Sequence, residues 1–361
     1  MTDIQTTSQI DVAAAEEFAG RLIGMFDGAC ATLMVSIGHQ TGLFDTLATL
    51  PAASSAGIAA SAGLDERYVR EWLKAMVMAR IVQHDPEADT YQLPAAHAAS
   101  LTREAGPDNL ARLMQYVPLL AGVEQPIIEC FRQGGGLSYG QYPRFHQVMA
   151  EESASVADAA LVETILPLVP GLPDRLSRGI HVADMGCGSG HAVNVMAAAY
   201  PASSFVGYDF SEEVIGVARA EASSLGLANA RFEVRDVAAL GDVGPFDLVT
   251  AFDSVHDQAH PAAVLANIAG CVADDGTFLM VDIKASSVVE DNLELPWATF
   301  LYTVSTMHCM TVSLGLGGEG LGTAWGQQLA VSMLRDAGFG SVEVMDVEDD
   351  PVNSYYIATK A

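Results

Sequence analysis

Basic residues are scarce in this chain of 361 residues. There are 17 Lys and Arg against 45 Asp and Glu, which gives a formal net charge of −28. Non-specific affinity for nucleic acid comes from neutralising phosphates with Lys and Arg, so such a surface repels DNA and RNA. The same charge opposes docking on anionic lipid. We therefore expect neither nucleic acid nor a membrane as a partner.

Cysteines are also few, and they lie far apart. The five of them form no C-x-x-C pair and no His/Cys cluster, so we expect reduced, buried thiols and no bound metal. The N-terminus is polar and acidic, and no apolar run approaches the ~20 residues that a bilayer-spanning helix needs. With half of its residues hydrophobic, the chain is expected to be a compact cytoplasmic protein.

What the chain does contain is an apolar run that leads into a glycine-rich turn, HVADMGCGSGH, between His181 and His191. Gly186, Gly188 and Gly190 recur at every second residue. Glycine is favoured where φ is positive or where a ligand approaches the backbone closely. The dinucleotide-binding fingerprint G-x-G-x-x-G would place the third glycine one position later, so NAD fits this loop poorly.

The D-x-G-x-G-x-G form of this turn resembles motif I of the class I S-adenosylmethionine (SAM) dependent methyltransferases, whose loop wraps the methionine portion of SAM. The resemblance covers about residues 173–361 and implies an α/β fold with a Rossmann-like, seven-stranded sheet. Further apolar runs end, in order, at Asp209, Asp236, Phe252 and Asp282. Two last runs, 341–347 and 354–359, predict a C-terminal hairpin, which also fits that fold.

The same resemblance implies a set of cofactor-binding residues. Asp209 follows the glycine loop by roughly 20 residues, where a carboxylate accepts hydrogen bonds from ribose hydroxyls. Asp236 matches the position that bonds the adenine amino group. The implied cofactor is S-adenosyl-L-methionine, held by Asp184, Gly186, Gly188, Gly190, Asp209, Phe210, Asp236, Val237 and Phe252.

Residues 57–100 predict a winged helix, with a helix at 67–81 followed by two short strands. The first 100 residues hold 12 acids and 5 bases, so their net charge of −7 opposes DNA binding. The segment also resembles the N-terminal domain of plant-type and actinobacterial small-molecule O-methyltransferases, in which it serves dimerisation. We therefore expect a homodimer. Its expected parts are a mostly helical winged-helix domain (1–105), a helical linker and lid (106–172), and a SAM-binding domain (173–361) with an insertion at about 284–323.

Candidate catalytic residues follow the fourth predicted strand. In the resembling O-methyltransferases a His-Asp pair there supplies the general base, and His256 and Asp257 match it. Histidine is suited to this task because its pKa lies near neutrality. Asp253, or a carboxylate from elsewhere, is the candidate to orient the imidazole. The Trp that follows the pair in that family is Gln258 here, which leaves the type of substrate open.

The linker and the insertion would cover the carboxyl ends of the strands, where open α/β sheets bind ligands. Candidate contacts to a small-molecule methyl acceptor are Tyr142, Arg144, His146, Trp297 and His308. The sequence predicts O-methylation assisted by a histidine base. S- or N-methylation without a strong base and a non-catalytic SAM-binding regulator remain alternatives, and a nucleotide-linked dehydrogenase ranks last.

Overall fold

The computed structural model describes residues 10–348 and 350–360, and the chain divides into two compact units between Pro118 and Leu119. The first part of the expected linker belongs to the N-terminal unit and the rest belongs to the C-terminal unit. The boundaries of the three expected segments stay predictions.

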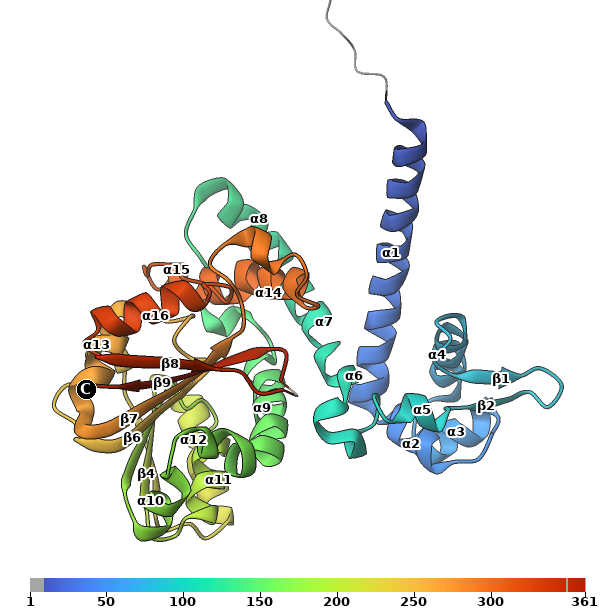
Figure 1. The fold of residues 1–361 in the computed structure, drawn as a ribbon. Coiled ribbons are helices and arrows are strands. Elements are labelled where there is room, and N and C mark those ends of the chain that lie inside the picture. Colours follow the sequence, from blue (N-terminus) through green and yellow to red (C-terminus); the bar gives the residue numbers. More distant parts are fainter. Residues whose placement is uncertain (1–9, 349, 361) are drawn as a thin grey trace, which may run out of the picture. The chain divides into compact units, whose positions relative to one another are not determined.

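The N-terminal unit is mainly helical (Figure 1). Its winged-helix part is confirmed, with two helices followed by an antiparallel two-stranded sheet. Asp65 caps the second of these helices by accepting hydrogen bonds from Arg67 N and Tyr68 N. This helix ends at Met78, three residues before the predicted end at Ile81, and Arg80 then takes a positive φ of 59°. The elements are α1 (Val12–Thr41), α2 (Leu43–Thr49), α3 (Ser55–Ala62), α4 (Glu66–Met78), β1 (Gln83–Asp85), β2 (Thr90–Gln92), α5 (Ala95–Ala98), η1 (Arg103–Asp108) and α6 (Leu110–Leu113).

Helix α1 differs from the other helices of this unit because most of its length is exposed. Its apolar side chains that face solvent are Val12, Phe18, Leu22, Ile23, Met25, Phe26, Leu33 and Ile37. By length and composition α1 could cross a membrane, so the expectation that no apolar stretch approaches that size is wrong. The broken helix pair Phe145–Leu168 and Leu172–Arg178 also passes the test if taken as one span, although it bends by 104°. The core helices of soluble proteins meet the same criterion.

The C-terminal unit is built on a seven-stranded sheet of order β5-β4-β3-β6-β7-β9-β8 (Figure 1). Its strands are β3 (His181–Met185), β4 (Ser204–Asp209), β5 (Ala230–Val234), β6 (Phe246–Phe252), β7 (Val272–Ile283), β8 (Ser341–Met345) and β9 (Asn353–Thr359). Strand β9 runs antiparallel to β7 and β8, while the other neighbouring pairs are parallel. The predicted sheet and its C-terminal hairpin are therefore confirmed.

Strand β7 begins well before the apolar residues that lead to Asp282. It starts at Val272 and includes Asp274, Asp275 and Gly276. Phe246 pairs with Val272 and Leu248 pairs with Thr277, so the extra residues form a bulge between these pairs. Gly276 fits there because a Cβ at this position would come within 2.8 Å of the Phe246 carbonyl oxygen.

Helices cover both faces of the sheet (Figure 1). One core packs α10, α11 and α12 against the sheet, and the other packs α13 and α16 against its opposite face. Helix α7 (Tyr116–Ala121) spans the boundary between the two units. The helices after it are α8 (Glu124–Gln133), η2 (Tyr139–Gln141), α9 (Phe145–Val156), η3 (Ala157–Ile165), η4 (Leu166–Leu168), α10 (Leu172–Arg178), α11 (His191–Ala199), α12 (Glu212–Ser224), η5 (Val237–Ala239), α13 (Pro261–Cys271), η6 (Val289–Asn292), α14 (Ala298–Val304), η7 (Ser305–Cys309), α15 (Met310–Gly315) and α16 (Gln327–Asp336).

The cysteines are free thiols, as expected, but they are not all buried. Cys271 and Cys309 are buried, Cys130 and Cys187 are half-buried, and Cys30 is exposed on α1. The burial of each cysteine depends on where the fold places it, and the spacing of the cysteines in the sequence does not predict this.

Candidate functional site

The glycine turn links β3 to α11 at the carboxyl end of the parallel strands. Gly186, Gly188 and Gly190 all have a positive φ, as their spacing predicts. A Cβ at Gly186 would come within 2.6 Å of Ser254, and one at Gly190 within 2.5 Å of Phe232. Of these three glycines, only Gly188 has free space at its Cβ position, with no described heavy atom of another part of the chain within 4 Å. Two of the three glycines therefore serve packing within the fold, and only Gly188 leaves space for a ligand.

Asp209 ends the neighbouring strand β4 and closes over this turn. Its carboxylate accepts hydrogen bonds from Gly188 N at 3.0 Å and from Ser211 N at 2.9 Å. Burial raises the pKa of Asp209, while these two hydrogen bonds act in the opposite direction. Asp236 is exposed and caps η5 by accepting a hydrogen bond from Ala238 N. The turn and both acids thus lie along one edge of the sheet.

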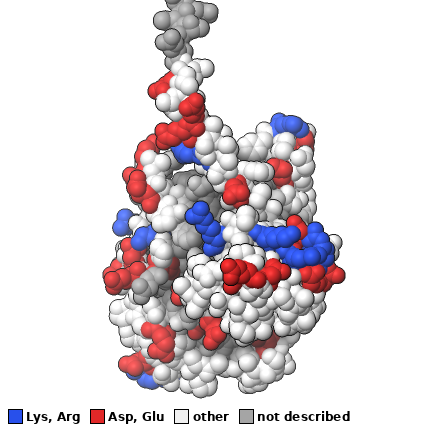
Figure 2. Space-filling model, turned by 90° about the vertical axis from the view of Figure 1, so that its right-hand side faces the viewer, with Lys and Arg blue, Asp and Glu red and all other residues white. Residues whose placement is uncertain are grey.

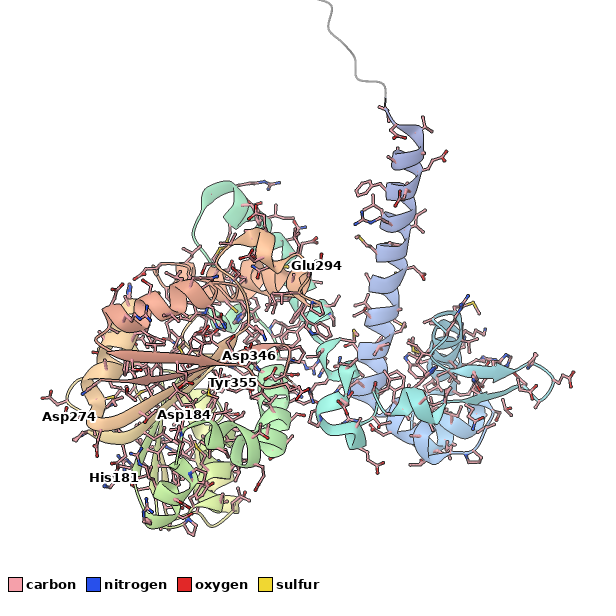
Figure 3. The ribbon with its side chains drawn as sticks, in the orientation of Figure 1. His181, Asp184, Asp274, Glu294, Asp346 and Tyr355 are labelled. Carbon is pink, nitrogen blue, oxygen red and sulfur yellow. The ribbon has the colours of Figure 1, made fainter. Side chains whose placement is uncertain are left out.

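Asp184 is buried inside the sheet at the end of β3, and Figure 3 labels it among the strands. Thr250 of β6 donates a hydrogen bond to Asp184 Oδ1 at 2.6 Å. Burial raises the pKa of Asp184 to about 7, although the hydrogen bond from Thr250 partly opposes this. Asp184 therefore fixes β3 against β6 rather than facing open space.

A buried histidine–aspartate pair lies beside the glycine turn. His256 follows β6, and its Nδ1 lies 2.8 Å from Oδ1 of Asp282 in the neighbouring strand β7. Both side chains are buried, with exposed fractions of 6% for His256 and 0% for Asp282. Asp282 Oδ1 also accepts hydrogen bonds from the Trp325 indole at 3.1 Å and from its neighbour's amide, Ile283 N, at 2.8 Å. The pair is thus held in one orientation.

The electrostatics of this pair favour a strongly basic imidazole. Burial alone would lower the pKa of His256, but the Asp282 carboxylate outweighs it and raises that pKa well above its usual value. Asp253 adjoins the pair with a left-handed φ of 48°, and its Oδ1 is buried without a hydrogen-bond partner among the described residues. Burial and the Asp282 charge raise the pKa of Asp253 to about 7.

Asp257 contacts a different group. The Tyr139 hydroxyl donates a hydrogen bond to Asp257 Oδ2 at 2.5 Å. The segment around Tyr139 is also fixed to the insertion, because Leu137 N donates to Thr311 O and the Tyr142 hydroxyl donates to Met307 O. We call residues 134–142 the strap. The strap ties the predicted linker to the insertion and to the loop that holds Asp257.

Rings from the strap, α9 and η7 gather around His308. Tyr139, Tyr142, Phe145 and His308 form this group, which we call the aromatic group. The Tyr139 ring also stacks on His146 and lies near Phe210. Three predicted substrate residues, Tyr142, His146 and His308, therefore come together.

The other two predicted substrate residues lie elsewhere. Arg144 is exposed and donates a hydrogen bond to Gln147. Trp297 is half-buried at the start of α14. Their roles as substrate contacts stay predictions.

Sequence reasoning missed three residues of the site, Asp282, Tyr139 and Trp325. A signal for Asp282 was present, since it ends the apolar strand that pairs with the strand before His256. Tyr139 and Trp325 reach their partners across 118 and 43 residues of chain, a separation that no local pattern encodes.

A cleft of about 680 Å³ lies apart from these residues, between α8 and the insertion. Its lining is mostly apolar and includes Ile127, Phe131, Tyr302 and Met307, but neither His256 nor Asp282. We therefore assign the chemistry to the strand ends rather than to this cleft.

Two family descriptions match the chain. Residues 29–103 match an Rv2258c-like winged HTH domain, and residues 176–338 match a methyltransferase domain. The chain is also 31% identical over 121 residues to a trans-aconitate 2-methyltransferase of Methylobacterium nodulans. That match spans 34% of this chain and only 42% of the relative.

Solved structures share the whole architecture at low sequence identity. A putative O-methyltransferase of Nostoc punctiforme has a TM-score of 0.72 and 17% identity, over 94% of this chain and 98% of that one. Human N-acetylserotonin methyltransferase, solved in complex with SAM, has a TM-score of 0.64 and 17% identity over 99% of both chains. These likenesses confirm the predicted fold.

Proposed function

Since this chain joins a winged HTH domain to a methyltransferase domain, we propose that it is an enzyme that transfers a methyl group from S-adenosyl-L-methionine to a small-molecule nucleophile. O-methylation with His256 as the general base is the reaction that the geometry supports best. The observation that carries it is the buried His256–Asp282 pair at the ends of two adjacent strands, β6 and β7.

The residues at the sheet edge fit this cofactor. Gly188 leaves open space where a side chain would stand, and the carboxylate of Asp209 lies next to it. Two carboxylate oxygens suit a pair of ribose hydroxyls, and Asp236 follows the next strand along the edge. When bound, SAM supplies an electrophilic methyl group on a sulfonium.

The protein's own part in the reaction is to take a proton and to exclude water. Asp282 accepts the hydrogen on Nδ1, so the neutral imidazole of His256 keeps its lone pair on Nε2. Nε2 is then the atom that takes the proton of an acceptor hydroxyl as its oxygen is methylated. A positioned base contributes about 10²–10⁴-fold to such a step. A thioether, thiolate or neutral amine acceptor would need alignment alone, and the His256→Ala variant separates the two cases.

The proposed partners are a small-molecule methyl acceptor and a second copy of the chain, without nucleic acid. Figure 2 shows basic side chains lying beside acidic ones on the face that it draws. On α4, the helix that a DNA-binding winged helix would place in the groove, Arg67 pairs with Glu71 and Arg70 pairs with Glu66. Helix α1 offers an exposed apolar face for the second copy. A cytoplasmic location stays a prediction.

Calorimetric titration of the purified protein with SAM, S-adenosylhomocysteine and NAD tests the proposal. We expect saturable binding of the first two ligands and none of NAD. Methyl transfer to a panel of phenols and thiols would then identify the acceptor atom. Absence of binding to both SAM compounds would refute the proposed function, and binding without turnover of any acceptor would favour the regulator instead.

A further inference from the structure

His308 is a buried histidine whose two ring nitrogens both lack a hydrogen-bond partner among the described residues. Its exposed fraction is 1%. Buried polar atoms are nearly always hydrogen-bonded, so two orphaned nitrogens on one ring require an explanation. The residue lies in η7, a π-helical turn, and such turns occur frequently at functional sites.

The neighbouring rings do not satisfy these nitrogens. Phe145 stacks on His308 with ring centroids 3.5 Å apart and an interplanar angle of 12°. Tyr142 and Tyr139 approach edge-on at 4.7 and 5.3 Å. Their hydroxyls are used elsewhere, by the Met307 carbonyl and by the Asp257 carboxylate. The aromatic group therefore fixes the imidazole plane, while both ring nitrogens stay buried without a hydrogen-bond partner among the described residues.

We propose that His308 is a specificity-determining residue that hydrogen-bonds the methyl acceptor through its ring nitrogens and selects an acceptor without negative charge. This inference rests on the proposed function, because it assigns an acceptor contact within the same site. His308 packs against Tyr139 and Tyr142 of the strap, and Tyr139 hydrogen-bonds Asp257 in the loop that holds His256, so an acceptor on His308 would enter at this contact.

The charge state of His308 sets what it can recognise. Burial, together with the charges of His256 and His146, lowers the pKa of His308 to about 3, so the ring is neutral near pH 7. A neutral imidazole offers one N–H donor and one acceptor nitrogen, which suits a group that both donates and accepts, such as a hydroxyl. The carboxyl groups of Asp257 and Asp209 face the same group of rings and oppose an anion.

The test compares two probes that differ by one carboxylate, 2-naphthol and 6-hydroxy-2-naphthoate. Calorimetry is carried out on the full chain saturated with S-adenosylhomocysteine. We expect wild-type protein to bind 2-naphthol at least about tenfold more tightly than the carboxylated probe. His308→Phe keeps the ring stack but removes both nitrogens, so 2-naphthol should bind about tenfold more weakly. His308→Asn, which retains a donor and an acceptor, should recover part of the loss.

A matched control is His84→Phe, since His84 stacks on Tyr91 in the wing of the N-terminal unit. It should leave both probe affinities unchanged. The affinity of each variant for S-adenosylhomocysteine shows that it is folded. Equal 2-naphthol affinity of wild type and His308→Phe, preference for the carboxylated probe, or no binding of either probe to the loaded wild type would overturn the inference. Failure of wild type to bind S-adenosylhomocysteine would overturn the proposed function instead.

Discussion

At the scale of the single residue, Asp209 is the sharpest test of the cofactor assignment. Replacing it with Ala removes charge-assisted hydrogen bonds worth about 1.5–3 kcal/mol, so SAM binding should weaken roughly ten- to a hundredfold. Calorimetry measures this change. Glu213 lies four residues further on in the first turn of α12, and Glu213→Ala is the control that should bind SAM normally. Unchanged affinity of Asp209→Ala would contradict the assigned site.

His256 gives a prediction for the dependence of turnover on pH. The base works only when it is deprotonated, and Asp282 raises the pKa of His256 well above its usual value. Methyl transfer should therefore keep increasing as the pH rises through and beyond neutrality. Asp282→Asn removes the charge that raises this pKa, so the increase should move to lower pH.

A pH–rate profile with saturating SAM measures both effects. At a pH high enough to deprotonate His256, the His256→Ala variant should lower turnover by about 10²-fold or more and leave SAM affinity nearly intact. His260 is exposed at the start of α13, and His260→Ala serves as the control. A profile of Asp282→Asn identical to that of wild type would show that Asp282 does not tune the base.

Asp184 links a buried carboxyl group to stability. Its folded-state pKa is raised from 3.8 to about 7, so the folded protein binds this proton more tightly than the unfolded chain does. Below about pH 4 the Asp184 carboxyl group is protonated in both states and does not lower the free energy of unfolding. As the pH rises from about 4 to 7, the unfolded chain ionises this group first, and the free energy of unfolding decreases. Asp184→Asn should relieve roughly 1–3 kcal/mol of this cost at pH 8, because a neutral amide cannot ionise.

Denaturant unfolding of the cofactor-free protein at pH 4 and pH 8 measures the difference. Thr250 donates to Asp184 Oδ1, and the amide oxygen of Asn can accept the same bond. Asp236→Asn, at an exposed carboxyl group, should change stability little at either pH. A stabilisation by Asp184→Asn that is equal at both pH values would refute the ionisation argument.

At the scale of the element, the strap packs closely against α15 because Gly136 and Gly315 have no side chain at their points of contact. A Cβ at Gly315 in α15 would come within 2.5 Å of the Leu137 carbonyl oxygen, and one at Gly136 within 2.0 Å of Thr311 O. Gly315→Ala should push the strap away from α15 and weaken the contact between Tyr139 and Asp257. We expect turnover to fall at least about tenfold while SAM affinity is kept.

The control for this variant is Gly216→Ala in α12, where a Cβ meets nothing within 4 Å. Alanine favours a helix interior over glycine by roughly 0.5–1 kcal/mol, so this change should preserve or raise stability. Steady-state kinetics with the identified acceptor compare the two variants. If Gly315→Ala keeps full turnover, the strap has no part in the reaction.

The elements also show where sequence reasoning succeeds. Apolar runs predicted β3, β4 and β6, since buried parallel strands leave a clear local pattern. The π-helical turn Ser305–Cys309 left no such pattern, because it differs from an α-helix by one inserted residue. The orientation of His308 follows from that turn and from rings distant in sequence. Its role as an acceptor contact stays a prediction, and its unpartnered nitrogens could not be foreseen from the sequence.

At the scale of the whole molecule, the sequence predicted the α/β class and the winged helix but misjudged α1. Helix α1 contains no unbroken apolar run. Small and acidic residues alternate with large apolar ones along its 30 residues, so its overall apolar character is not evident from any single run. Most of these apolar side chains are exposed in the single chain. Burying them against a partner would therefore be favourable. Because the charge of −28 opposes an anionic membrane, a second copy of the chain is the partner that we propose.

Sedimentation velocity tests this assembly. We expect the wild-type protein to be a dimer, and a double variant Phe18→Glu and Phe26→Glu to shift it to the monomer, since each introduced carboxylate would have to be buried in the apolar contact. Met78→Glu changes an equally exposed apolar residue on α4 and should leave the dimer intact. A monomeric wild type, or one that sediments with neutral phosphatidylcholine vesicles, would refute the proposed dimer. Loss of SAM binding in the double variant would mean instead that it has misfolded, because Phe18 and Phe26 belong to the N-terminal unit and the residues of the proposed cofactor site belong to the C-terminal unit.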